Sequence, residues 1–102
     1  MKTDDLMAGL PGADLVREGL ADVTAGRRTI AACLIAIGSP RLRQAGLIPT
    51  GALLLADAEL QLYRFLLQTG GDAYSRYNAL LRELISFETA LDRRLARAQA
   101  VE

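Results

Sequence analysis

The chain has 102 residues, 51% of them apolar, and its 12 basic residues balance 12 acidic ones. Its length predicts a single domain, and the balanced charge excludes a whole-molecule attraction to nucleic acid or to an anionic membrane. Histidine is absent, so the commonest general base and the commonest transition-metal ligand are both missing. We therefore expect a protein that is not an enzyme and that holds neither a metal nor another cofactor.

The single cysteine, Cys33, excludes a disulfide within the chain, and its apolar neighbours predict a buried, inert thiol. The first residues include Asp4 and Asp5, where a secretion signal has a long apolar run. The longest uncharged stretches, 29–40 and 44–56, are shorter than the roughly twenty residues that a membrane-spanning helix needs. These features predict a cytoplasmic protein with no membrane partner.

Residues 1–11 contain glycine and proline, and we expect them to form a loose arm before a single helical-bundle domain over residues 12–102. The domain begins with a predicted helix from near Gly12 to Ile37, which Gly38 ends in a left-handed conformation. Apolar positions spaced alternately by four and three residues form its packing stripe. The stripe comprises Val16, Leu20, Val23, Arg27, Ile30, Leu34 and Ile37, so one cation lies among apolar residues.

Small residues recur every seven positions beside this stripe, at Gly12, Gly19, Gly26 and Cys33. A glycine inside a helix costs about 1 kcal/mol relative to alanine. The repeat therefore predicts a helix face that another backbone approaches closely, the alternative being that the spacing is incidental.

Two further helices are predicted in the middle of the chain. The first is short, with Ser39 as its N-cap and Gly46 at its end. The second ends before Gly70 and begins after either Thr50 or Asp57; the latter choice leaves an apolar connector in front of it. Its apolar residues cover so much of its circumference that we expect it to contact more than one neighbour.

The last predicted helix is capped by Asp72 and continues to about residue 100. Its packing stripe comprises Tyr74, Tyr77, Leu81, Leu84, Glu88, Leu91 and Leu95. The chain is thus predicted to be an all-α bundle of three main helices plus one short helix. So small a chain offers more apolar helix faces than one core can cover, which favours completion by homo-oligomerisation, with a dimer as the favoured state.

Each long stripe contains one charge, Arg27 in the first and Glu88 in the second, and the two charges are opposite. We expect them to form a buried ion pair, either within one chain or across a dimer, whose role is to fix register or oligomeric state. Two alternatives stay open for Arg27. It could extend its guanidinium from the edge of the core into water, or it could bind an anion.

A basic patch, consisting of Arg27, Arg28, Arg41 and Arg43, contains no acid between its first and last members. It is a candidate anion-binding or RNA-binding site, the alternative being a solvated surface. No aromatic residue lies among these arginines, and the short helix is not followed by a polar recognition helix. Nucleic acid is therefore a disfavoured partner, although it is not excluded.

Tyr74, Arg76 and Tyr77 at the start of the last helix are interface candidates, because tyrosine and arginine are enriched among residues that dominate binding. The alternative is that the two tyrosines form the tapered end of the core. The sequence predicts a non-catalytic helical interaction protein, such as an accessory, regulatory or antitoxin-like subunit. It would act through self-association and binding of a protein partner, with anion or RNA binding by the basic patch as the alternative.

Overall fold

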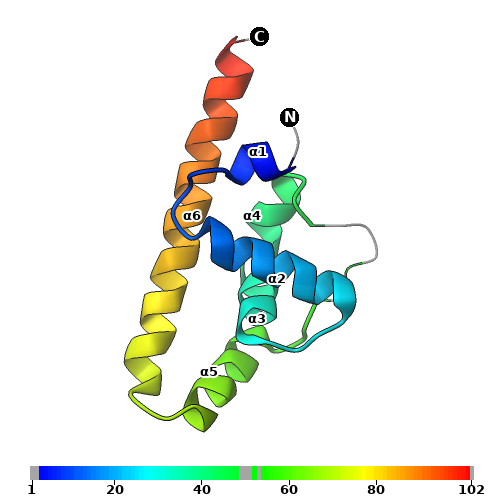
Figure 1. Cartoon of the computed structure of the whole chain (residues 1–102). Coiled ribbons are helices and arrows are strands. Elements are labelled where there is room, and N and C mark those ends of the chain that lie inside the picture. The colour runs from blue at the N-terminus through cyan, green and yellow to red at the C-terminus, as the bar shows by residue number, and fades with distance from the viewer. Residues whose placement is uncertain (1–2, 49–51, 53, 102) are drawn as a thin grey trace.

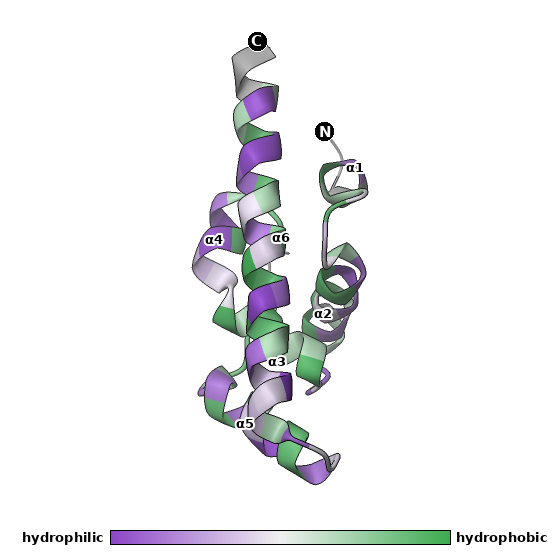
Figure 2. Cartoon of the chain, turned by 90° about the vertical axis from the view of Figure 1, so that its left-hand side faces the viewer, coloured by the Kyte–Doolittle hydropathy of each residue, from purple (hydrophilic) through white to green (hydrophobic). Residues whose placement is uncertain are grey.

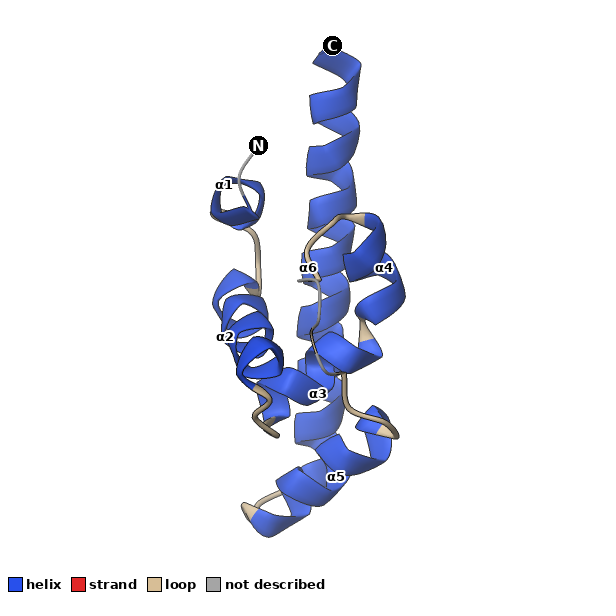
Figure 3. Ribbon diagram, turned by 90° about the vertical axis from the view of Figure 1, so that its right-hand side faces the viewer, coloured by secondary structure: helices blue, strands red, loops and turns tan. Residues whose placement is uncertain are grey.

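The structure, a computed structural model, describes residues 3–48, 52 and 54–101. These residues form helices and connecting loops without a strand, which confirms the all-α prediction. The helices are α1 (Thr3–Met7), α2 (Ala13–Ala25), α3 (Ile30–Ile37), α4 (Ser39–Gln44), α5 (Ala58–Gln68) and α6 (Ala73–Val101). Figure 1 shows α6 as a rod along one side of the molecule, with α1 to α5 arranged along it. In the opposite views of Figures 2 and 3, α2 and α4 lie on either side of α6.

The single long helix expected from Gly12 to Ile37 is wrong, because the chain breaks between α2 and α3. Gly26 ends α2 with a φ of 73°, a left-handed conformation that glycine adopts without steric cost. Thr29 then begins α3, since its Oγ1 accepts a hydrogen bond from the Ala32 N–H at 3.1 Å. The break allows α3 to turn back and pack against α2 (Figure 1).

The close backbone approach expected along the glycine repeat occurs at one of its positions. Gly19 lies inside α2, and a Cβ added there would be 2.5 Å from both the Ala31 carbonyl oxygen and Ile35 Cγ1 of α3. Gly12 and Gly26 instead flank α2 in left-handed conformations, so the repeat is not one continuous helix face. Gly19 is therefore the position that brings the α2 and α3 backbones together.

The expectation of a loose N-terminal arm is also wrong over the described part of that segment. Residues Thr3–Met7 form α1, and the side chains of Leu6 and Met7 are buried. The carbonyl oxygen of Leu6 accepts a hydrogen bond from Arg94 Nη1 of α6 at 3.1 Å. Two apolar side chains and an arginine on the last helix thus hold the segment against the body.

The core consists of two clusters, and α6 contributes to both. The first cluster gathers Phe87 and Leu91 with buried residues of α1, α2, α3 and α4. The second gathers Leu84 with residues of α3 and α5, and it includes Cys33, whose predicted burial is confirmed. Burial raises the pKa of the Cys33 thiol, which disfavours the reactive thiolate. Helix α6 is therefore the element that connects the two halves of the core.

The remaining helix ends agree in part with the predictions. Gly46 has a φ of 75° after α4, and Asp72 Oδ1 accepts a hydrogen bond from the Ser75 N–H at 3.1 Å, as expected of a terminator and a cap. Gly38 has a φ of −87° and is not left-handed; it, and not Ser39, precedes α4. An added Cβ at Gly38 would meet Leu84 of α6, so packing and not helix termination explains this glycine.

The boundaries of α5 match the second of the two predicted starts, because the helix begins directly after Asp57. The Asp57 side chain makes no capping hydrogen bond, and the alternative cap, Thr50, lies outside the described residues. Over the described parts of the chain, no helix combines the length and the apolar character needed to cross a membrane.

Candidate functional site

The candidate site is a surface on α5 and α6 that we call the α5–α6 apolar face. Its members are large apolar side chains that are more than half exposed: Leu60 (52%), Leu67 (59%), Tyr74 (68%) and Ile85 (55%). Leu60 and Leu67 are two turns apart on α5, and Tyr74 and Ile85 are three turns apart on α6. Each pair therefore lies on one side of its helix.

A pair of tyrosines connects the two helices beside this face. The rings of Tyr63 on α5 and Tyr77 on α6 pack edge to face, with centroids 5.9 Å apart and planes inclined by 72°. Tyr63 lies between Leu60 and Leu67 in the sequence, and Tyr77 is one turn from Tyr74. This ring contact therefore connects the two helices that carry the exposed side chains.

The turn between α5 and α6 is held by polar contacts. Arg76 donates from Nη1 to the Gly70 carbonyl oxygen at 3.1 Å and to Thr69 Oγ1, and the Thr69 hydroxyl donates to the Leu66 carbonyl oxygen at 3.0 Å. Asp72 caps α6 from the same turn. The helix pair is thus fixed before any partner arrives, which lowers the conformational entropy lost on binding.

The structure assigns different positions to the three residues predicted as interface candidates. Tyr74 projects into solvent, Tyr77 is half-buried against Tyr63, and Arg76 holds the turn. The sequence patterns did not single out Leu60, Leu67 or Ile85 as exposed. The signal for them was the excess of apolar residues around α5 and α6, which exceeded what one packing stripe could bury.

The expected ion pair between Arg27 and Glu88 is wrong within the chain. Arg27 lies in the loop after α2, and its Nε donates to Asp22 Oδ1 at 2.9 Å. Buried Asp22 also accepts a hydrogen bond from the Thr29 hydroxyl at 2.6 Å. The Thr29 hydroxyl is the strongest influence on the pKa of Asp22, which it lowers with help from Arg27 and against the effect of burial.

Glu88 faces Arg41 instead, across the contact between α6 and α4. The Glu88 side chain is 6% exposed, and its Oε2 lies 3.9 Å from Arg41 Nε without a hydrogen-bond partner in the described structure. Arg41 makes its close ion pair with Asp92, one turn further along α6. Burial therefore dominates at Glu88 and raises its pKa, although Arg41 opposes the shift.

The four arginines of the predicted basic patch do not converge. Arg27 and Arg28 lie before α3, whereas Arg41 and Arg43 lie after it on α4. The eight residues of α3 separate the two pairs by about 12 Å along the helix axis. Arg27 and Arg41 are also neutralised by Asp22 and Asp92. The geometry thus weakens the alternative of anion or RNA binding by this patch.

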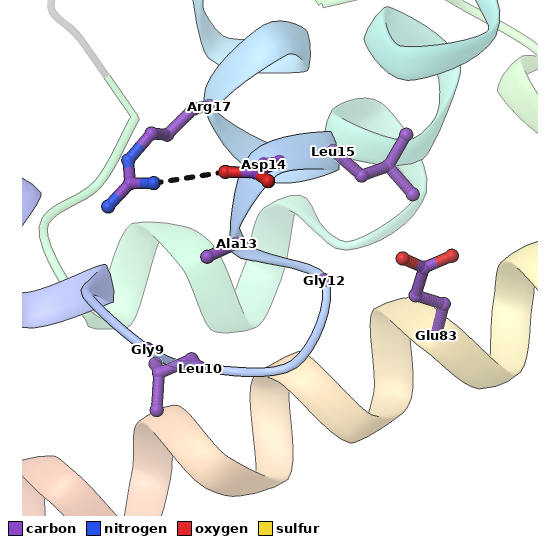
Figure 4. A pocket seen from close by; sticks show the side chains of 8 residues that line it. All are labelled: Gly9, Leu10, Gly12, Ala13, Asp14, Leu15, Arg17 and Glu83. Carbon is purple, nitrogen blue, oxygen red and sulfur yellow. Dashed lines mark hydrogen bonds and ion pairs between the residues drawn. The ribbon is translucent and has the colours of Figure 1, made fainter.

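A hollow of about 260 Å³ lies between the α1–α2 turn, the start of α2 and α6 (Figure 4). On one side Arg17 Nη1 contacts Asp14 Oδ1 at 3.3 Å, and on the other the Glu83 side chain rises from α6 toward α2. Across the described chain, no three histidine, cysteine or acidic side chains come together as metal ligands. The hollow offers two separated acids rather than a converging set of catalytic groups.

Comparison of the chain with protein-family models, with curated proteins and with solved structures finds no match. The function is therefore argued from the residues and their surroundings alone.

Proposed function

We propose that this chain is a non-catalytic helical subunit that self-associates, and binds its protein partner, through the α5–α6 apolar face. One observation supports this proposal above the others. The large hydrophobic side chains that are strongly exposed in the described residues all belong to α5 and α6, while α1 to α4 cover theirs. Such a concentration of exposed apolar residues on one helix pair is characteristic of an interaction surface.

The energy available from covering this face is substantial. Complete burial of a large apolar side chain contributes about 1.5–3 kcal/mol, so the four members together offer several kcal/mol toward association. The tyrosines add ring contacts and hydroxyl groups that suit the edge of an interface. Because α5 and α6 are already tied together by their turn, little of this energy is lost in ordering the surface.

A second copy of the chain is the simplest partner for the α5–α6 apolar face. Two helix pairs that pack face to face form a four-helix bundle, an arrangement in which each pair covers the apolar stripe of the other. A two-fold axis through the face would place the same residues on both sides of the interface. Figure 1 shows α5 and the start of α6 at one end of the molecule, away from the end at which α6 finishes.

The test is the mass of the protein in solution, measured by size-exclusion chromatography with light scattering over a hundredfold range of concentration. The proposal predicts a species of twice the 11.0 kDa chain mass. Leu67→Glu should produce a monomer, because it places a charge in the contact. Gln68→Glu introduces the same charge on the next, exposed position of α5 and should leave the dimer intact.

Circular dichroism of both variants shows whether the helical fold is kept. A wild-type chain that stays monomeric at every concentration contradicts self-association. Equal weakening of the dimer by Leu67→Glu and Gln68→Glu contradicts the placement of the interface on the α5–α6 apolar face.

A further inference from the structure

A second hollow, of about 210 Å³, lies between the chain that follows α1 and the C-terminal half of α6. Its lining consists of Leu10, Ala90, Arg93, Arg94 and Arg97. Three of these five residues are arginines and none is acidic. Arg97 follows Arg93 by four residues and Arg94 by three, so the three side chains project from neighbouring positions on one side of α6.

One of the three guanidinium groups is anchored. Arg94 Nη1 donates to the carbonyl oxygens of Leu6 at 3.1 Å and Ala8 at 2.5 Å, at the end of α1. Neither contact neutralises the charge, because both acceptors are backbone carbonyls. Arg94 is thereby held at the hollow with donors to spare, which reduces the entropy lost when it binds a ligand.

Two acids that precede the cluster on α6 face α4 and not the hollow. Asp92 pairs with Arg41 of α4, and buried Glu88 faces the same arginine. Among the described residues, no carboxylate lies within 4.0 Å of the guanidinium nitrogens of Arg93, Arg94 or Arg97. In Figure 2, the part of α6 between α4 and the C-terminus carries several hydrophilic segments, drawn in purple.

Complementing the helix dipole does not account for this arrangement. Basic residues stabilise a helix when they lie within its last turn. Helix α6 continues to Val101, so Arg93 and Arg94 precede its end by about two turns. The dipole also gives no reason for the arginines to line a hollow together with Leu10 and Ala90.

We propose that this hollow binds a phosphate group, either as the free ion or as a phosphomonoester of a small molecule. The planar forks of guanidinium groups match the oxygens of phosphate and donate two hydrogen bonds at once. Three positive charges exceed what a single carboxylate needs and suit a group that carries close to two negative charges. The site is separate from the α5–α6 apolar face, since the two surfaces share no residue.

A nucleic-acid backbone fits the hollow less well. Single-stranded nucleic acid is held by grooves in which aromatic rings stack on the bases, and the lining of this hollow contains no aromatic residue.

The experiment is isothermal titration calorimetry of the full chain with inorganic phosphate, at constant ionic strength maintained with chloride. The double variant Arg93→Gln/Arg97→Gln is the main test, because both residues are exposed and neither holds α1 in place. We expect it to weaken phosphate binding at least about tenfold. The matched control is Arg82→Gln/Arg64→Gln, which removes two exposed arginines of α6 and α5 away from the hollow; it should change the dissociation constant less than twofold.

Titration with phenyl phosphate distinguishes the two sources of the group. Tighter binding of phenyl phosphate than of inorganic phosphate identifies a phosphomonoester whose apolar part rests on Leu10 and Ala90. Equal binding identifies the free ion, and either result supports the site. Absence of phosphate binding at millimolar concentration overturns the proposal, as does an equal loss in both double variants. Binding of a single-stranded oligonucleotide without binding of either phosphate compound also overturns it.

Discussion

Asp22, buried near the end of α2, accepts a 2.6 Å hydrogen bond from the hydroxyl of Thr29, the residue that begins α3. The same hydroxyl oxygen accepts a hydrogen bond from the Ala32 N–H. One threonine therefore supplies a hydrogen bond to a buried carboxylate and also caps α3. Arg27, between them, donates to the other oxygen of Asp22. Hydrogen bonds among these three side chains therefore hold the loop that connects α2 to α3.

Thr29→Val should lower the free energy of unfolding by about 1–3 kcal/mol, because it removes the cap and leaves the Asp22 carboxylate short of a donor. Urea unfolding followed by circular dichroism measures the change. The control is Thr24→Val, which removes an exposed hydroxyl that donates to the Leu20 carbonyl oxygen within α2, and which should cost much less. If the two variants lose the same free energy of unfolding, the hydrogen bonds to Asp22 do not stabilise the fold more than an ordinary side-chain hydrogen bond does.

The same network predicts an acid sensitivity. The pKa of Asp22 is lowered below its ordinary value of 3.8, so its contribution is complete above that pH and is lost as the pH falls through the lowered pKa. Thr29→Val removes the largest cause of the shift. Unfolding measured between pH 5 and pH 2 should therefore depend less steeply on pH in Thr29→Val than in the wild type, whereas Thr24→Val should follow the wild type.

The pKa of Glu88 is shifted in the opposite direction to that of Asp22. Burial raises its pKa above the ordinary value of 4.5, so its ionisation opposes folding as the pH rises from 4.5 through the raised pKa. Glu88→Gln keeps the shape and removes this charge, and the melting temperature at pH 7 should be maintained or increased. Glu83→Gln, an exposed change of the same kind on α6, should have little effect. A marked fall for Glu88→Gln alone would show that the contact with Arg41 outweighs desolvation.

Gly19→Ala tests the close approach of α2 and α3. Helix propensity favours alanine by about 1 kcal/mol, but the new Cβ would collide with the Ala31 carbonyl oxygen and with Ile35. Separation of the helices should cost about 1–3 kcal/mol, so the net effect is destabilising. Ala21→Val adds bulk to an exposed position of the same helix and should change the unfolding free energy by less than about 0.7 kcal/mol. A more stable Gly19→Ala variant would contradict the packing.

Met7→Ala tests whether α1 belongs to the folded body. The Met7 side chain is fully buried, and its truncation should cost about 2–5 kcal/mol in urea unfolding. Asp5→Ala changes an exposed residue of the same helix and serves as the control. If both variants unfold at the wild-type urea concentration, α1 contributes nothing to the stability of the protein.

Local signals in the sequence identified much of the fold. Asp72 and Gly46 act at helix ends as their residue types predict, and the apolar surroundings of Cys33 correctly indicated burial. The stripe from Val16 to Ile37 was misleading, because its spacing is the same in one long helix and in two short helices that pack together. Gly26 followed by Thr29 carried the missing information, and these local signals outweighed the periodic pattern.

Charge partners were harder to predict because they depend on how distant segments meet. Arg41 and Asp92 are 51 residues apart, and no spacing rule within a helix connects them. Likewise, the excess of apolar residues was visible in the sequence, but its location at Leu60, Leu67 and Ile85 depends on which faces α3 and α6 cover. The sequence therefore predicted that some apolar surface would remain exposed, but it did not predict which residues would form that surface.

Because α6 supplies residues to both core clusters, the order of synthesis matters for this protein. Helices α1 to α5 leave the ribosome first, and until α6 follows them neither cluster has its full set of apolar side chains. The carbonyl groups of Leu6 and Ala8 also lack their donor until Arg94, 88 and 86 residues later in the chain, has been made. The nascent chain must therefore hold incomplete apolar surfaces until α6 has been made, and α1 and α6 reach their final positions together.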